Sequence, residues 1–168
     1  MNAGLPPAAD VEALRTRLEL EAESAGYHLK PDIEFTRSLT HGLLVNEDRY
    51  GYRACPCRLA SGDAARDRDI VCPCDYRDAD LLAWGGCFCG LYVSAEIREG
   101  KTSLASVPER RPSAAERAQV PNAAPRLGRA LSLPVWRCRV CGYLCARQRP
   151  PAVCPICKAT SDRFEAFA

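Results

Sequence analysis

Six of the eleven cysteines lie within 35 residues and form three Cys-x-Cys pairs. These pairs are Cys55-Pro56-Cys57, Cys72-Pro73-Cys74 and Cys87-Phe88-Cys89. Two cysteines that flank one residue do not easily form a relaxed disulfide with each other, because disulfide geometry is demanding. Proline fixes φ of the middle residue, so a stiff Cys-Pro-Cys turn can direct one sulfur at a metal centre and its neighbour elsewhere. Four metal ligands plus one redox-active pair would account for all six thiols.

A zinc site or a purely structural cluster is the alternative use of these six cysteines. Zinc ligands usually follow Cys-x₂₋₄-Cys spacing rather than Cys-x-Cys turns. Two thiols would also be left over after four had bound a metal. The spacing therefore favours redox chemistry.

A second group of cysteines has the spacing of a tetrahedral metal site. It consists of two Cys-x-x-Cys knuckles separated by twelve residues, with Cys138 and Cys141 in the first and Cys154 and Cys157 in the second. Gly142 permits a tight turn after the first knuckle, and Pro155 stiffens the second. Four sulfurs suit iron or zinc, and iron is favoured because the neighbouring region carries redox motifs. The eleventh cysteine, Cys145, is expected to be a semi-buried free thiol.

The N-terminal sequence and the expected use of the cysteines indicate the cellular compartment. The N-terminus has no basic segment followed by an apolar one, so we expect no secretory signal. No stretch approaches the roughly 18 apolar residues of a membrane span. Cysteines of reduced compartments are more often metal ligands or catalysts than disulfides. We therefore expect a cytoplasmic protein without a membrane partner.

Charge is distributed unevenly along the chain. Residues 1–97 contain 10 Lys and Arg against 16 Asp and Glu, a balance of −6, whereas residues 98–168 contain 13 against 5, a balance of +8. A basic half can indicate nucleic acid, but here the basic residues lie in a linker and beside cysteines, with no recognition helix. We expect no nucleic-acid partner. Steering of an acidic protein, docking between the halves or an ordinary solvated surface all account for the asymmetry.

Apolar periodicity predicts few regular elements. Residues 10–25 are expected to form a helix with Asp10 as N-cap and one apolar face, consisting of Val11, Leu14, Leu18 and Ala22. Further helices are expected over 35–45, 78–84 and 113–119, the last with Ser113 and Glu116 as a capping box. A short strand is expected over 91–93. The rest of 50–92 reads as loops organised by cysteines.

Residues from about 11 to 119 resemble the catalytic subunit, or beta chain, of ferredoxin–thioredoxin reductase. The resemblance rests on the order of the three Cys-x-Cys motifs, on Arg58 after the first, on Gly90-Leu91-Tyr92 after the third, and on the helical segment around Gly42. It implies an α-rich irregular domain around a [4Fe–4S] cluster. The implied cluster ligands are Cys55, Cys72, Cys74 and Cys87. Cys57 and Cys89 would form the active-site disulfide, with Cys57 as the exposed nucleophile.

The same resemblance implies an enzyme that reduces the disulfide of a thioredoxin-like protein. Its electrons would come from a ferredoxin or rubredoxin-type donor, and a small accessory subunit would be a further partner. Many members carry His where this chain has Phe88, which cannot donate a proton. We expect the partner surface around Cys57 to include Pro56, Arg58 and Phe88. The alternative from another class is a non-enzymatic electron-transfer protein.

Residues 135–168 resemble a short rubredoxin, especially the C-terminal module of rubrerythrins. The resemblance rests on Trp136 before the first knuckle, on Cys141-Gly142-Tyr143 and on Phe164. It implies a small β-ribbon domain with one iron, or alternatively zinc, on the four knuckle cysteines. We therefore predict a catalytic domain over 8–119, a linker over 120–134 and a rubredoxin-like domain over 135–168. The last domain is expected to admit electrons or to dock a partner.

Overall fold

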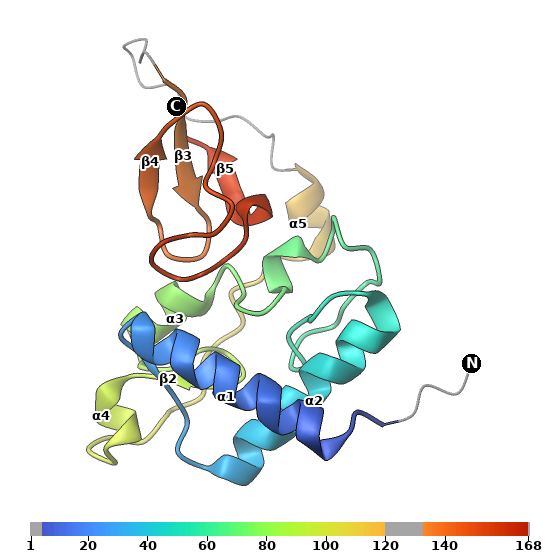
Figure 1. Ribbon diagram of the computed structural model, residues 1–168, viewed down its shortest axis with the longest axis vertical. Coiled ribbons are helices and arrows are strands. Elements are labelled where there is room, and N and C mark those ends of the chain that lie inside the picture. Colours follow the sequence, from blue (N-terminus) through green and yellow to red (C-terminus); the bar gives the residue numbers. More distant parts are fainter. Residues whose placement is uncertain (1–4, 120–132, 168) are drawn as a thin grey trace. The chain divides into compact units, whose positions relative to one another are not determined.

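The chain is described by a computed structural model that covers residues 5–119 and 133–167 (Figure 1). It divides into two compact units, Met1–Pro108 and Glu109–Ala168. The expected linker, 120–134, lies outside the described residues except for 133 and 134. Among the described helices, none is both long and apolar enough to span a membrane.

Helix α1 spans Ala8–Ser24 and buries the four residues that the periodicity predicts, Val11, Leu14, Leu18 and Ala22. The prediction that Asp10 caps this helix is wrong, because the N-cap is Pro7 and Asp10 lies in the first turn. The carbonyl of Pro7 accepts the backbone N–H groups of Asp10 and Val11 at 3.0 and 3.1 Å. The helix therefore starts earlier, and the Asp10 carboxylate faces the positive end of the helix dipole.

Helix α2 spans Ile33–Tyr50 and is longer than the predicted segment 35–45. The Asp32 side chain caps it by accepting the backbone N–H of Phe35 at 3.0 Å. The helix ends at Gly51, whose φ of 80° is left-handed. The last turn has mainly polar residues, so hydrophobic periodicity could not reveal it.

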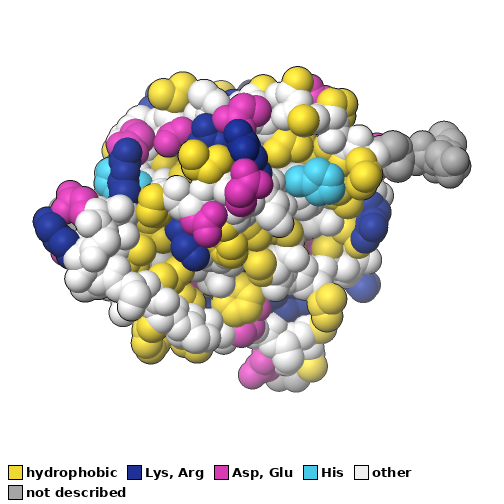
Figure 2. Space-filling view, turned by 90° about the horizontal axis from the view of Figure 1, so that it is seen from below, with side chains coloured by type: hydrophobic (Ala, Val, Ile, Leu, Met, Phe, Trp, Pro, Cys, Tyr) yellow, Lys and Arg dark blue, Asp and Glu magenta, His cyan; other side chains and the backbone are white. Residues whose placement is uncertain are grey.

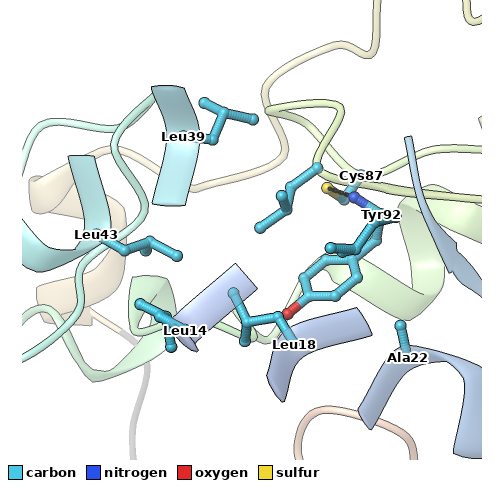
Figure 3. Packing of buried hydrophobic residues seen from close by; sticks show 9 residues of the cluster. Leu14, Leu18, Ala22, Leu39, Leu43, Cys87 and Tyr92 are labelled. Atoms are coloured by element: carbon cyan, nitrogen blue, oxygen red, sulfur yellow. Dashed lines mark hydrogen bonds between the residues drawn. The ribbon is translucent and has the colours of Figure 1, made fainter. Parts of the chain in front are cut away.

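The core of the N-terminal unit lies between α1 and α2. Leu14 and Leu18 of α1 point toward Leu39 and Leu43 of α2 (Figure 3). Full burial of each such side chain contributes about 1.5–3 kcal/mol. The core therefore has an apolar framework from two helices that follow each other along the chain.

A two-stranded antiparallel sheet packs on this core. Strand β1, His28–Leu29, pairs with β2, Tyr92–Val93, with Leu29 opposite Tyr92. The prediction of a strand near 91–93 is confirmed, whereas β1 was not predicted. Short helical segments complete the unit: η1 over Arg68–Ile70, α3 over Arg77–Trp84 and α4 over Ala95–Arg98. Helix α3 confirms the predicted segment 78–84.

Acidic and basic side chains lie interspersed with hydrophobic ones on the face seen in Figure 2. Arg37 of α2 contacts Glu12 of α1 at 3.1 Å and Glu34 at 2.9 Å. Arg98 of α4 contacts Glu23, the same carboxylate that lies 2.8 Å from His28. Exposed pairs of this kind contribute little to stability, because solvent screens them, so they tie neighbouring elements together only weakly.

The C-terminal unit contains α5, Ala114–Gln119, and a three-stranded antiparallel sheet. Ser113 and Glu116 form the predicted capping box, since each backbone N–H donates to the other's side chain at 2.7 and 3.3 Å. The strands are β3, Val135–Cys138, β4, Leu144–Ala146, and β5, Phe164–Ala166, in the order β4-β3-β5. A short helical turn, η2 over Ser161–Arg163, precedes β5.

Candidate functional site

The first two Cys-x-Cys motifs lie side by side because their backbones are hydrogen-bonded. The N–H of Cys55 donates to the carbonyl of Ile70 at 2.8 Å, and the N–H of Cys72 donates to the carbonyl of Arg53 at 2.9 Å. An isolated antiparallel bridge joins the residues between these contacts. Two motifs separated by fourteen residues in sequence are thereby fixed against each other.

Helix α2 supports the first motif through a close contact at Gly42. A Cβ atom added at Gly42 would lie 2.8 Å from the Cβ of Pro56, which is closer than two such atoms approach. Only glycine therefore lets Pro56 pack on this helix without displacement. The side-chain amide of Asn46, one turn later, donates to the carbonyl of Ala54 at 2.9 Å.

The third motif is a tight turn attached to β2. The N–H of Gly90 donates to the carbonyl of Cys87 at 2.8 Å, and the N–H of Cys87 donates to the carbonyl of Tyr92 at 2.9 Å. In return the N–H of Tyr92 donates to the Sγ of Cys87 at 3.3 Å (Figure 3). The Sγ atoms of Cys87 and Cys89 lie 3.6 Å apart. The apolar core thus fixes the position of the Cys87 sulfur.

Asp67, which sequence analysis did not single out, organises the loop between the first two motifs. Its fully buried carboxylate accepts the Tyr52 hydroxyl at 2.7 Å and the backbone N–H groups of Ser61 and Gly62 at 2.5 and 3.2 Å. Burial and this carboxylate raise the pKa of Tyr52 to about 12. The phenol therefore stays protonated and remains a donor to Asp67.

The six thiols of the three motifs differ in exposure. Cys57 is exposed, Cys72 and Cys89 are half-buried, and Cys55, Cys74 and Cys87 are buried. All of them are free thiols. Interactions with the thiols of Cys55 and Cys89 lower the pKa of Cys57, whereas the pKa of Cys89 is raised by its contacts with neighbouring thiols and by burial. Cys57 is therefore the thiol that a macromolecule can reach, and its neighbours favour its ionised form.

Of the four predicted cluster ligands, Cys55, Cys74 and Cys87 are buried and Cys72 is half-buried. Burial raises the pKa of Cys74 to about 12 and also raises that of Cys72, and the nearby Cys55 and Cys87 raise both further. Four thiolates can share such a site only when a cationic group compensates their charge. Cysteine thiolates are the usual ligands of iron–sulfur clusters. The donor set therefore fits such a cluster, and the assignment of each ligand stays a prediction.

Arg58 is 7% exposed and lies against the second and third motifs. Its Nη1 donates to the Sγ of Cys74 at 3.3 Å. Its guanidinium lies 4.8 Å from the ring centroid of Tyr76 and 4.5 Å from that of Phe88. The expectation that Arg58 belongs to an exposed partner surface is wrong, because these two rings and the sulfur enclose its side chain.

The four knuckle cysteines of the C-terminal unit come together as predicted. The Sγ atoms of Cys138, Cys141, Cys154 and Cys157 all lie within 4.8 Å of one another. Two of the contacts, Cys138 with Cys157 and Cys141 with Cys154, are 3.6 Å long. The interaction with Cys157 lowers the pKa of Cys138 to about 5. Four converging sulfurs suit iron or zinc, which bind such a set tetrahedrally.

Backbone geometry explains how the two knuckles present these sulfurs. The N–H of Gly142 donates to the carbonyl of Cys138 at 2.9 Å, and that of Lys158 donates to the carbonyl of Cys154 at 3.1 Å. Both residues have left-handed φ angles, 76° for Gly142 and 62° for Lys158. The same type of turn therefore closes both knuckles. Its left-handed residue is Gly142 in the first knuckle and Lys158 in the second.

The aromatic residues on which the resemblance to a rubredoxin rests pack around this site. Phe164 is buried among the cysteines, and Trp136 and Tyr143 are half-buried against them. The indole N–H of Trp136 donates to the carbonyl of Arg147 at 2.9 Å. Cys145 is a half-buried free thiol, as expected.

Comparisons with known protein families match the two units of the chain separately. The family model for the ferredoxin thioredoxin reductase catalytic beta chain matches residues 7–110, well over half of the chain. The family model for the rubrerythrin rubredoxin-like domain matches residues 136–165. No curated protein sequence matches the chain. The family matches and the four-cysteine site together support an iron–sulfur redox protein.

Proposed function

Because the chain belongs to the family of ferredoxin thioredoxin reductase catalytic beta chains and carries a rubredoxin-like domain, we propose that it reduces the disulfide of a thioredoxin-like protein. The electrons come from a one-electron iron–sulfur donor such as a ferredoxin. One observation carries the proposal: of the six thiols in the three motifs, Cys57 alone is exposed, and it interacts with the half-buried Cys89. An exposed thiol beside a second one suits exchange with a protein disulfide.

Cys57 is the attacking thiol in this proposal. Its thiolate forms a bond to one sulfur of the target disulfide, and the other target sulfur leaves as a thiolate that takes up a proton. Cys89 then attacks the Cys57 sulfur of the mixed disulfide, and the second target thiolate leaves. The products are a target dithiol and a Cys57–Cys89 disulfide. Two electrons and two protons return this pair to thiols.

Cys55, Cys72, Cys74 and Cys87 would hold a [4Fe–4S] cluster. When bound, such a cluster supplies electrons one at a time, as a donor of single electrons requires. The chain contributes the enclosure: Cys55, Cys74 and Cys87 are buried, and the turn at Gly90 keeps Cys89 3.6 Å from the Cys87 sulfur. The exposed Cys57 therefore faces the partner while the sulfurs behind it are shielded from water.

The C-terminal cysteines would hold one iron, with zinc as the alternative metal. We propose that this domain admits electrons or docks the partner. Metal analysis of anaerobically purified protein tests the two sites together: about five irons per chain and no zinc are expected. About four irons with one zinc would assign a structural role to the C-terminal metal. A chain without iron would refute the cluster and the enzyme.

A Cys57→Ser variant tests the proposed reaction. We expect loss of thioredoxin disulfide reduction with reduced ferredoxin, together with unchanged iron content and visible absorption, because the four proposed ligands are untouched. Cys145→Ser is the matched control, since it makes the same change at a half-buried thiol of the other unit. It should keep full activity.

A non-enzymatic electron carrier predicts a different result. Such a carrier would pass electrons to an artificial acceptor such as a cytochrome, and the unmodified chain would reduce no disulfide. Retained disulfide reduction in Cys57→Ser would instead show that another thiol is the nucleophile.

A further inference from the structure

Arg58 connects the three cysteine motifs. It directly follows Cys57 of the first motif, it donates to the Sγ of Cys74 in the second, and it packs on the ring of Phe88 in the third. It is buried, and arginine stays protonated in proteins. A permanent positive charge therefore lies against a sulfur that the proposed function assigns to the cluster.

Charge and hydrogen bonds at the sulfurs are among the features that set the potential of an iron–sulfur cluster. Reduction adds a negative charge, so a fixed cation nearby favours the reduced form. The interaction is stronger in a buried site than at the surface, because less solvent screens it. The 3.3 Å contact between the Arg58 Nη1 and Cys74 supplies both features at one sulfur.

Two aromatic rings hold the guanidinium in this position. Tyr76 and Phe88 present their faces at 4.8 and 4.5 Å from its central carbon. Cation–π attraction of this kind is stronger when the pair is desolvated, as it is at the buried Arg58. The uncharged ring of Phe88 can therefore hold the guanidinium of Arg58. A protonated imidazole at this position would repel it.

We propose that Arg58 is a positioning residue that holds a positive charge on the Cys74 sulfur and thereby raises the reduction potential of the cluster, and that Phe88 keeps Arg58 there. The inference rests on the proposed function, because it takes Cys74 as a ligand. It goes further by giving a role to Arg58, which lies outside the ligand set, and to Phe88, which lies between the last two motif cysteines.

An anaerobic redox titration, followed by visible absorption and electron paramagnetic resonance, tests the proposal. Arg58→Met keeps most of the apolar stem and removes the charge. We expect reduction of the cluster to become at least tenfold less favourable, which for one electron lowers the midpoint potential by at least 59 mV. Arg58→Lys keeps the charge but loses the planar stacking, so a smaller shift of the same sign is expected. Phe88→Leu should also give a smaller shift of that sign.

Arg49→Met is the matched control, because Arg49 also lies over an aromatic ring, that of Tyr50, but is exposed. This substitution removes the same charge. The equilibrium constant for reduction of the cluster should stay within a factor of two of that in the unmodified protein. An equal shift in Arg49→Met and Arg58→Met would overturn the proposal, since net charge alone would then be responsible. An unchanged potential in Arg58→Met would overturn it as well.

Iron content separates this inference from the proposed function. If the unmodified chain holds no cluster, both fail together. If the cluster is present and Arg58→Met leaves the potential unchanged, only the role of Arg58 fails. If Arg58→Met does not retain iron, Arg58→Lys and Phe88→Leu decide: unchanged potentials in both refute the proposal, and lowered potentials in both support it.

Discussion

The two units of the molecule use cysteine in different ways. In the N-terminal unit, the main apolar cluster of the described residues has nine buried members, mainly leucines, and only one of them, Cys87, is a cysteine. Cys55 and Cys74 are buried outside this cluster. In the C-terminal unit, three of the six buried core residues are cysteines, namely Cys138, Cys154 and Cys157. Sulfur sites are attached to an existing core in the first unit and constitute the core in the second.

This difference predicts how each unit depends on its metal. Transfer of leucine side chains from water stabilises the N-terminal unit whether or not its sulfurs bind a cluster. Among the described residues, the apolar cluster of the C-terminal unit has only three other buried members, Val140, Ala159 and Phe164. Domains of this size usually need a metal or disulfides to fold. We therefore expect metal binding and folding to be coupled in the C-terminal unit and largely separable in the N-terminal one.

The largest effect is expected from removal of one knuckle sulfur. Cys154→Ser should unfold the C-terminal domain, because structural four-ligand sites contribute roughly 10–16 kcal/mol of apparent binding free energy. Amide signals of 135–167 in a ¹H–¹⁵N spectrum should lose their dispersion, while those of α1 and α2 stay unchanged. Zinc-loaded protein should be used, since it avoids paramagnetic broadening in this domain.

Cys145→Ser is the control for this experiment, because it changes a cysteine of the same unit that lies outside the four-sulfur set. It should leave the spectrum dispersed. A Cys154→Ser spectrum that retained its dispersion over 135–167 would show that Val140, Ala159 and Phe164 suffice as a core, and the contrast between the units would disappear.

The reverse experiment addresses the N-terminal core. Leu43→Ala, at a side chain only 1% exposed between the two long helices, should lower the free energy of unfolding by about 2–5 kcal/mol. Urea unfolding followed by helical circular dichroism measures this change. Leu82→Ala, at a side chain 91% exposed, should change it by less than about 0.5 kcal/mol. Equal effects of the two substitutions would contradict an apolar framework at the α1–α2 interface.

The same contrast explains what the sequence could reveal. The apolar face of α1 and the four knuckle cysteines follow short-range rules, a 3.6-residue period and Cys-x-x-Cys spacing, so both could be predicted. Strand β1 has only two residues, too few for any periodicity. The end of α2 is polar, and only the left-handed Gly51 marks it.

Periodicity and cysteine spacing could not predict contacts between loops that are distant in sequence. Arg58 and Cys74 are sixteen residues apart, and neither periodicity nor spacing brings the guanidinium to that sulfur. Asp67 is buried in a loop where sequence alone suggests a solvated carboxylate, since its donors are backbone N–H groups fixed only after folding. A glycine in a helix, Gly42, was the one local signal of a close approach, and its neighbour Pro56 could not be named in advance.

The smallest effect is expected from substitutions at the left-handed residues of the two knuckles, Gly142 and Lys158. A left-handed conformation costs a residue with a side chain roughly 1–2 kcal/mol, whereas glycine loses more backbone freedom on folding, worth about 0.5–1 kcal/mol. Gly142→Ala should therefore lower the stability of the metal-loaded domain by about 1 kcal/mol. Lys158→Gly should raise it by about 0.5 kcal/mol, because it relieves the same strain at the second knuckle. Thermal unfolding at one fixed metal concentration measures both, since bound metal shifts the midpoint by mass action. A lower midpoint for Lys158→Gly would mean that the hydrogen bond from the Lys158 ammonium to the carbonyl of Pro155, 3.0 Å long, outweighs the backbone strain.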